Sequence, residues 1–248
     1  MGRFPGEDDF MHIMEGCLPG PWWQIWTVLS FIVVIYGIYR LNQLVKKNRE
    51  LLPLLAVAGA FIFVFSCLKL PSVTGSCSHP TGTGLSAIMF GPAITSVVGF
   101  IVLLFQALLL AHGGMTTLGA NVFSMGIFGP FVGWGLFKIL QKAKAPIYLN
   151  VFLAAAVADL ATYVLTSFEM AIGLSYDVAG GFGDPFMSLM IEQSIGFLSI
   201  FAVTQLPLAV IEGLILTVAF KYLVKVKGEL IVKLGIIDDE QLQKIRDN

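Results

Sequence analysis

Long apolar runs constrain this chain more than any other feature of its sequence. The first run, residues 22–39, is long enough to cross the hydrocarbon core of a bilayer and opens with three tryptophans, as at a membrane interface. Comparable runs cover residues 51–68, 118–140, 146–172 and 196–222. With 56% hydrophobic and 12% charged residues among 248, the composition is that of a polytopic membrane protein. We therefore predict an all-α fold whose helices lie in a lipid bilayer.

Clusters of positive charge predict how the chain is oriented. Such clusters follow three of the runs, within residues 40–49, 138–144 and 221–227. Lysine and arginine favour the cytoplasmic side, so the N-terminus is expected outside and the C-terminus in the cytoplasm. The loops at residues 69–83 and 112–117 are then also expected outside.

Residues 84–111 are apolar but interrupted at Gly91 and Pro92, where proline disfavours a continuous helix. Because both ends of this segment are expected outside, it must cross the membrane twice or form a re-entrant pair. Two short crossing helices give about seven transmembrane helices in all, which we favour, and a re-entrant pair gives five.

The chain divides into three expected parts. Residues 1–10 lack the apolar core of a secretory signal and are expected to be an extension: an early start, a tag or a processed leader. Residues 11–225 form the transmembrane domain. Residues 226–248 form a cytoplasmic tail that mixes apolar and charged residues and is expected to contain a short helix.

Two histidine-containing stretches, residues 11–16 and 75–84, are predicted to meet on the outer face. A free α-amine on Met11, the amide nitrogen of His12 and the His12 imidazole would close two fused chelate rings on a divalent metal, with His79 as a fourth nitrogen donor. Four nitrogens suit Ni(II), Cu(II) or low-spin Co(II) better than Mg²⁺ or Ca²⁺. The chelate requires removal of residues 1–10, because otherwise the Met11 nitrogen is an amide.

Three further residues are candidates for supporting this site. His112 falls at the outer end of a span and is interpreted as a group that orients a loop, with a ligand role as the alternative. Glu15 is expected either to orient His12 or to cap the first helix. Asn121 follows a glycine-containing turn and is expected to bond within the same outer cluster.

Asp159, Glu169 and Glu212 are carboxylates in or near apolar spans, where an ionisable group normally has a functional or pairing role. Asp159 and Glu212 are expected to lie far from the histidine site and to bond between helices or contact a partner subunit. An alternative function follows from them, a proton-coupled carrier or a membrane enzyme. A purely structural scaffold is a third hypothesis.

Several functions lack their sequence signature. The chain contains no Walker A sequence, no H-E-x-x-H motif and no nucleophile elbow, so it is not predicted to be an enzyme or to hydrolyse ATP. No basic stripe indicates nucleic-acid binding. Energised transport would need another subunit.

Five motifs resemble the CbiM/NikM family, the substrate-capture components of energy-coupling-factor (ECF) importers for cobalt and nickel. They are MHIMEG at residues 11–16, SVTGSCSHPTGTGL at 72–85, FQALLLAHGG at 105–114, TTLGAN at 116–121 and AVTQLP at 202–207. The resemblance implies a bundle of seven transmembrane helices in the prokaryotic plasma (inner) membrane. It also implies three kinds of partner: a CbiQ-like transmembrane coupling subunit, CbiO-like ATP-binding subunits and a small CbiN-like membrane subunit.

The resemblance further implies a ligand set for the transported metal. Residue by residue, the family's metal-binding positions correspond to Met11, His12 and His79. The residues around His79 and His112 favour the cobalt branch, so Co(II) uptake for cobalamin biosynthesis is the predicted function. Ni(II) is the alternative cargo, because nitrogen ligands bind Ni(II) at least as strongly. No organic cofactor is implied.

Overall fold

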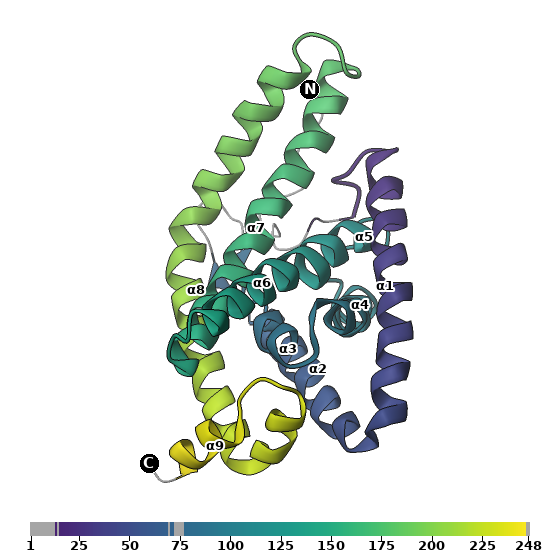
Figure 1. Cartoon of the computed structure of the whole chain (residues 1–248). Coiled ribbons are helices and arrows are strands. Elements are labelled where there is room, and N and C mark those ends of the chain that lie inside the picture. The colour runs from purple at the N-terminus through teal and green to yellow at the C-terminus, as the bar shows by residue number, and fades with distance from the viewer. Residues whose placement is uncertain (1–12, 14, 69, 72–76, 247–248) are drawn as a thin grey trace.

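The computed structural model describes residue 13 and residues 15–68, 70–71 and 77–246, and it has the predicted all-α fold. The helical elements in chain order are α1 (Trp22–Lys47), η1 (Arg49–Leu51), α2 (Leu52–Ser66), α3 (Thr83–Phe90), α4 (Pro92–Leu109), α5 (Leu118–Asn121), the π-helical η3 (Val122–Phe128), α6 (Gly129–Lys142), α7 (Ile147–Ala179), α8 (Phe186–Lys233) and α9 (Asp239–Arg246). A short antiparallel pair, β1 (Leu70–Pro71) with β2 (Cys77–Ser78), joins α2 to α3 in register Leu70 to Ser78. Figure 1 shows α1, α7 and α8 running lengthwise around the central helices.

Six stretches of the described chain are long and apolar enough to cross a membrane. They are Trp22–Lys47, Arg49–Ser66, Pro92–Leu109, Leu118–Lys142, Ile147–Ala179 and Phe186–Lys233. The predicted break is present, since α3 ends at Phe90 and α4 begins at Pro92, with Gly91 between them at φ 80°. However, α3 has 8 residues and spans only about 12 Å, so it does not add a seventh helix of spanning length.

The last two spans are longer than the sequence indicated. Residues 173–195, which separate the apolar runs 146–172 and 196–222, are mostly helical, because α7 continues to Ala179 and α8 begins at Phe186. Hydropathy marks where the apolar run ends, whereas a helix can continue past that point into polar surroundings. The two helices form the hairpin at the top of Figure 1. At the other end, α8 passes the expected end at residue 222 and continues to Lys233 with non-helical dihedrals at Lys227.

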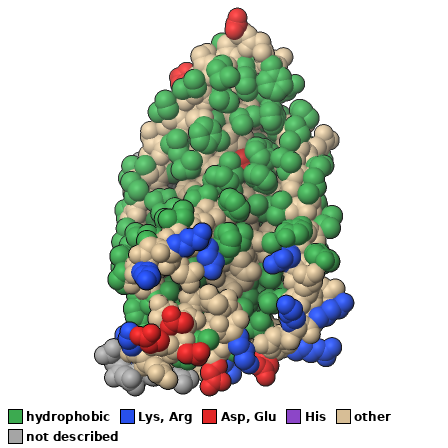
Figure 2. Space-filling model, viewed as in Figure 1, with side chains coloured by type: hydrophobic (Ala, Val, Ile, Leu, Met, Phe, Trp, Pro, Cys, Tyr) green, Lys and Arg blue, Asp and Glu red, His purple; other side chains and the backbone are tan. Residues whose placement is uncertain are grey.

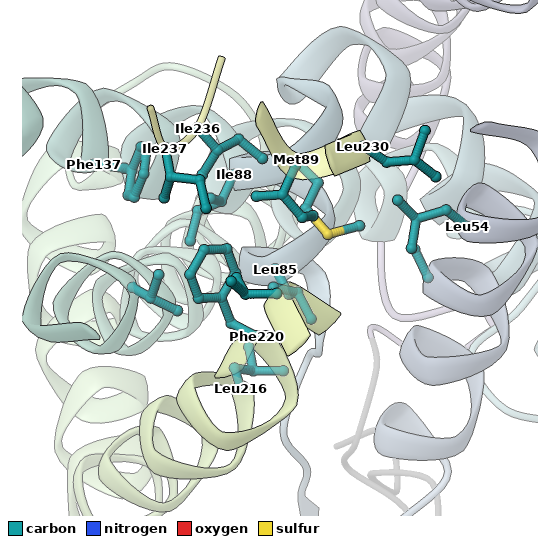
Figure 3. Packing of buried hydrophobic residues seen from close by; sticks show 14 of the residues in the cluster. Leu54, Leu85, Ile88, Met89, Phe137, Leu216, Phe220, Leu230, Ile236 and Ile237 are labelled. Carbon is teal, nitrogen blue, oxygen red and sulfur yellow. The ribbon is translucent and has the colours of Figure 1, made fainter. Parts of the chain in front are cut away.

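A helix buried along most of its length, α3, occupies the centre of the bundle. Its residues 83–89 are all buried, and the helix packs against α4, α6 and α7. Gly84 permits the approach to α7, because a Cβ atom there would lie 2.8 Å from the Ala155 Cα atom. Figure 3 shows Leu85, Ile88 and Met89 of α3 among buried residues of α8 and the chain after it. This packing fixes α3, and therefore the loop that precedes it.

The two ends of the bundle differ in charge. On the face shown in Figure 2, the lysine and arginine side chains lie in the lower half, and hydrophobic side chains cover most of the upper half. The short α9 lies at the lower end and contacts α8, where the Leu242 side chain packs against Gly228. A helix within the expected tail is therefore present, preceded by the extension of α8.

Candidate metal site

His79 lies in a loop that is built into the bundle. This His79 loop, residues 79–82, connects β2 to α3, and the His79 side chain is 3% exposed. Tyr163 of α7 holds its backbone at two points: the hydroxyl donates to the His79 carbonyl oxygen at 2.9 Å and accepts from the His79 N–H at 3.1 Å. The Gln205 amide of α8 also donates to that carbonyl oxygen at 3.4 Å. Two long helices thus fix one end of the loop.

Glu212 of α8 fixes the other end of the His79 loop. Its carboxylate accepts from the N–H of Thr81 at 2.6 Å, from the N–H of Gly82 at 2.9 Å and from the Thr81 hydroxyl at 3.1 Å. These amides precede the first turn of α3, where backbone N–H groups have no partner within the helix and favour negative charge. Gly82 takes φ 68°, a left-handed conformation that favours glycine, as the chain enters α3.

The expectation that Asp159 and Glu212 lie far from the histidine site was wrong. Both are fully buried, and Glu212 directly contacts the His79 loop. Asp159 accepts a hydrogen bond at 2.6 Å from Gln205, the residue that also reaches the His79 carbonyl oxygen. The error arose because the His79 loop enters the bundle, whereas charge bias could place it only on a side of the membrane.

A small cavity adjoins the His79 ring. Its volume is about 20 Å³, room for one water-sized particle. The lining residues come from the His79 loop, α5, η3 and α7: His79, Asn121, Ser124, Met125, Thr162, Tyr163 and Thr166. The π-helical turn of η3 contributes two of them, and such turns are frequent at functional sites.

Asn121 connects this cavity to the amino-terminal segment. Its side-chain oxygen accepts from the Ile13 N–H at 3.0 Å, and its amide donates to the Ile13 carbonyl oxygen at 3.1 Å. The Thr117 hydroxyl donates to the same carbonyl oxygen. Ile13 is 1% exposed and packs with Leu18 and Ala120. The predicted ligands Met11 and His12 precede Ile13 and lie outside the described residues.

His112 lies beside His79, although the two are far apart in sequence. Their ring centroids are 5.8 Å apart in an edge-to-face arrangement, and the His112 side chain is 5% exposed. Left-handed dihedrals at Ala111 (φ 49°) and Gly113 (φ 76°) turn the chain sharply on either side of it. The structure therefore brings His79, His112 and Asn121 to one region of the bundle.

Glu15 does not cap the first helix. The N-cap position of α1 is Pro21, and it has no side-chain capping hydrogen bond. Glu15 is exposed and accepts instead from the Thr116 N–H, at 3.1 Å from its nearer oxygen. The capping interpretation was wrong because the chain after Glu15 turns before α1 begins.

Tyr163 and Gln205 were missed as site residues by the sequence analysis. Gln205 lies within a recognised motif, and an amide in an apolar span is a usable signal, since it needs hydrogen-bond partners there. Tyr163 gave a weaker signal, because tyrosine is common in membrane helices and only the fold brings its hydroxyl to the His79 backbone.

Chemically, the described residues supply one imidazole beside a small, mostly neutral cavity. Within the described part of the chain, no three His, Cys, Asp or Glu side chains gather closely enough to hold a metal ion. His79 can therefore be one ligand of a metal but does not complete a site with the other described side chains.

The fold and the length and composition of its helices define a polytopic α-helical membrane protein. Residues 12–230 match the CbiM family, described as the cobalt uptake substrate-specific transmembrane region, and the chain belongs to this family. It is a membrane component for cobalt uptake, a metal transporter component and not an enzyme. It is a multi-pass protein of the prokaryotic plasma membrane.

Known proteins resemble the chain over nearly its whole length. CbiM 1 of Methanosarcina barkeri is 53% identical over 238 residues, which cover 96% of this chain and 99% of the relative. The cobalt transport protein CbiM of Chlorobium limicola is 51% identical over 93% of this chain and 87% of the relative. The crystal structure of a transition metal transporter superposes with a TM-score of 0.70 and 26% identity, covering 87% of this chain and 93% of that one.

Proposed function

We propose that this protein captures Co(II) from outside the cell for an ATP-driven ECF importer that supplies cobalamin biosynthesis. One observation carries the proposal. Asn121 lines the cavity beside the His79 ring and also holds both backbone groups of Ile13, the residue after the predicted chelating pair. The buried His79 imidazole and the amino-terminal segment at Ile13 are therefore connected through one residue, Asn121.

The proposed ligands are the Met11 amine, the amide nitrogen and imidazole of His12, and the His79 imidazole. Ile13, which follows the proposed ligands in the chain, is anchored by Asn121. The proposal requires that residues 1–10 be removed, which exposes the amine. Residues 11–225 then form the transmembrane domain and residues 226–248 the tail.

The orientation and the partners are parts of the same proposal. The lysine and arginine side chains concentrated towards one end of the bundle support a cytoplasmic C-terminus, with the amino-terminal segment outside. Because the chain contains no Walker A sequence, ATP hydrolysis is assigned to CbiO-like subunits, joined through a CbiQ-like coupling subunit. A small CbiN-like membrane subunit completes the proposed assembly.

Cobalt is proposed as the cargo in preference to nickel. The matching family is described by cobalt uptake, and the Chlorobium relative is named a cobalt transport protein. Nitrogen ligands alone do not favour Co(II), because Ni(II) lies above Co(II) in the general order of affinities. Uptake measured with both ions present decides the cargo.

The bonds of Asp159 and Glu212 favour a supporting role over a proton-carrier function. Glu212 binds two amides and a hydroxyl of the His79 loop, and Asp159 binds Gln205. Both groups therefore have a structural partner in the loop or beside it.

The test is calorimetric titration of Co(II) into purified protein that begins at Met11. We expect binding that His79→Ala weakens at least 100-fold, because a ligand is lost. His112→Ala is the comparison and should weaken binding less, since His112 is proposed to orient rather than bind. Protein that retains residues 1–10 should bind more weakly than the shortened protein. Unchanged Co(II) affinity in His79→Ala would refute the proposal.

A further inference from the structure

Glu169 is a buried carboxylate that the network around His79 does not use. Its side chain in α7 is 0% exposed, and neither oxygen has a hydrogen-bond partner among the groups that the structure describes. Glu212, equally buried, accepts three hydrogen bonds. Keeping an unbonded carboxylate inside a membrane helix is costly and normally reflects a functional partner.

The position of Glu169 on α7 indicates where that partner lies. Thr162, Thr166, Glu169 and Gly173 recur at helical spacing and form one stripe of the helix surface. Thr162 and Thr166 line the cavity beside His79. At the other end of the stripe, a Cβ atom on Gly173 would lie 2.8 Å from the Leu18 side chain. Glu169 therefore lies between the cavity and the amino-terminal segment.

Ser124 of η3 and the next residue of α7 support this placement. Ser124 of η3 lines the cavity, and its hydroxyl, which donates to the Ala120 carbonyl oxygen, also lies close to the Glu169 carboxyl group. Met170, the next residue of α7, packs against the cluster formed by Ile13, Leu18 and Ala120. The carboxylate is thus close to both parts of the proposed metal site without belonging to the cavity lining.

The cavity lacks negative charge of its own. Its lining combines an imidazole, an amide, hydroxyl groups and a thioether, with no carboxylate. Transferring a divalent cation from water into such surroundings is unfavourable unless an anionic group compensates its charge. We propose that Glu169 supplies this compensation, as a positioning and charge-balancing residue for the captured divalent cation. This inference rests on the proposed function.

The test compares Glu169→Gln with the unsubstituted protein, both beginning at Met11. The substitution keeps the side-chain shape and removes the charge. We expect the Co(II) Kd to rise at least tenfold. We expect the melting temperature of the metal-free protein to stay the same, because the amide keeps the side-chain shape and no cation is present that needs the charge. Glu169→Asp should recover part of the affinity, and Glu192→Gln, at an exposed position of α8, is the matched control.

Each outcome bears on the inference separately from the proposed function. Co(II) affinity within twofold of the unsubstituted value in Glu169→Gln would overturn the inference, while a loss of binding in His79→Ala would still support the proposed function. A fall in metal-free melting temperature alongside the loss of affinity would assign Glu169 a structural role and also overturn it. Absence of Co(II) binding by the unsubstituted protein would overturn both proposals.

Discussion

The two segments that approach the cavity are held in different ways. The His79 loop lies inside the bundle, where Tyr163, Gln205 and Glu212 bond to its backbone from two long helices. The amino-terminal segment is held at Ile13 by side chains of residues 117 and 121. One part of the site is therefore fixed by the core of the fold, whereas the other is attached to it by a few local bonds. Substitutions that disrupt the His79 loop should therefore also destabilise the fold. Substitutions that detach the amino-terminal segment should weaken metal binding while the fold stays largely intact.

Glu212→Ala gives the largest expected effect. The change leaves the buried amides of Thr81 and Gly82 without their acceptor, so we expect a loss of about 3 to 5 kcal/mol in the free energy of unfolding, together with loss of Co(II) binding. Thermal unfolding in detergent measures it. Glu192→Ala, at an exposed carboxylate, should change stability little. Equal stability in the two variants would show that the His79 loop does not depend on Glu212.

Asn121→Ala should separate binding from folding. It removes both hydrogen bonds to Ile13, so we expect a stability loss of about 1 to 2 kcal/mol but a Co(II) Kd about 10 to 100 times higher. Asn150→Ala removes another buried amide, whose bond goes to the Ala145 carbonyl oxygen away from the cavity, and should leave the Kd unchanged. If both variants bind Co(II) equally well, the attachment at Ile13 has no part in capture.

Tyr163→Phe is expected to have the smallest effect on Co(II) affinity. The ring still packs and the His79 carbonyl oxygen keeps its bond from Gln205, but the His79 N–H loses its acceptor, so we expect a stability loss of about 1 to 2 kcal/mol. Co(II) affinity should fall less than tenfold, as measured by the same titration. Tyr148→Phe, near the start of α7, serves as the control for loss of a hydroxyl. A fall as large as that of Glu212→Ala would mean that Tyr163, rather than Glu212, dominates the loop.

The sequence was sufficient for features that depend on local composition. Apolar runs located the spanning helices, and Gly91 with Pro92 located the break between α3 and α4. Helix ends were less predictable, because α7 and α8 continue well beyond their apolar runs. Hydropathy indicates where a segment leaves the lipid. The helix itself can end at a different residue.

Contacts between distant segments were the part that the sequence could not supply. His79 and Asn121 were predicted to share one region, and the structure brings both to the same cavity. Glu212 was assigned elsewhere, because position along a helix gives depth in the membrane but not which loop enters to that depth. A single sequence carries no signal for such pairings.

The small volume of the cavity has a consequence for how ions are sorted. With about 20 Å³ beside His79, a cation that occupies it cannot keep its shell of water molecules. Mg²⁺ gives up that shell reluctantly and prefers oxygen ligands, whereas transition metals exchange water for nitrogen more readily. A strongly hydrated cation such as Mg²⁺ would therefore be disfavoured in this cavity by the cost of removing its water, in addition to its preference for oxygen ligands.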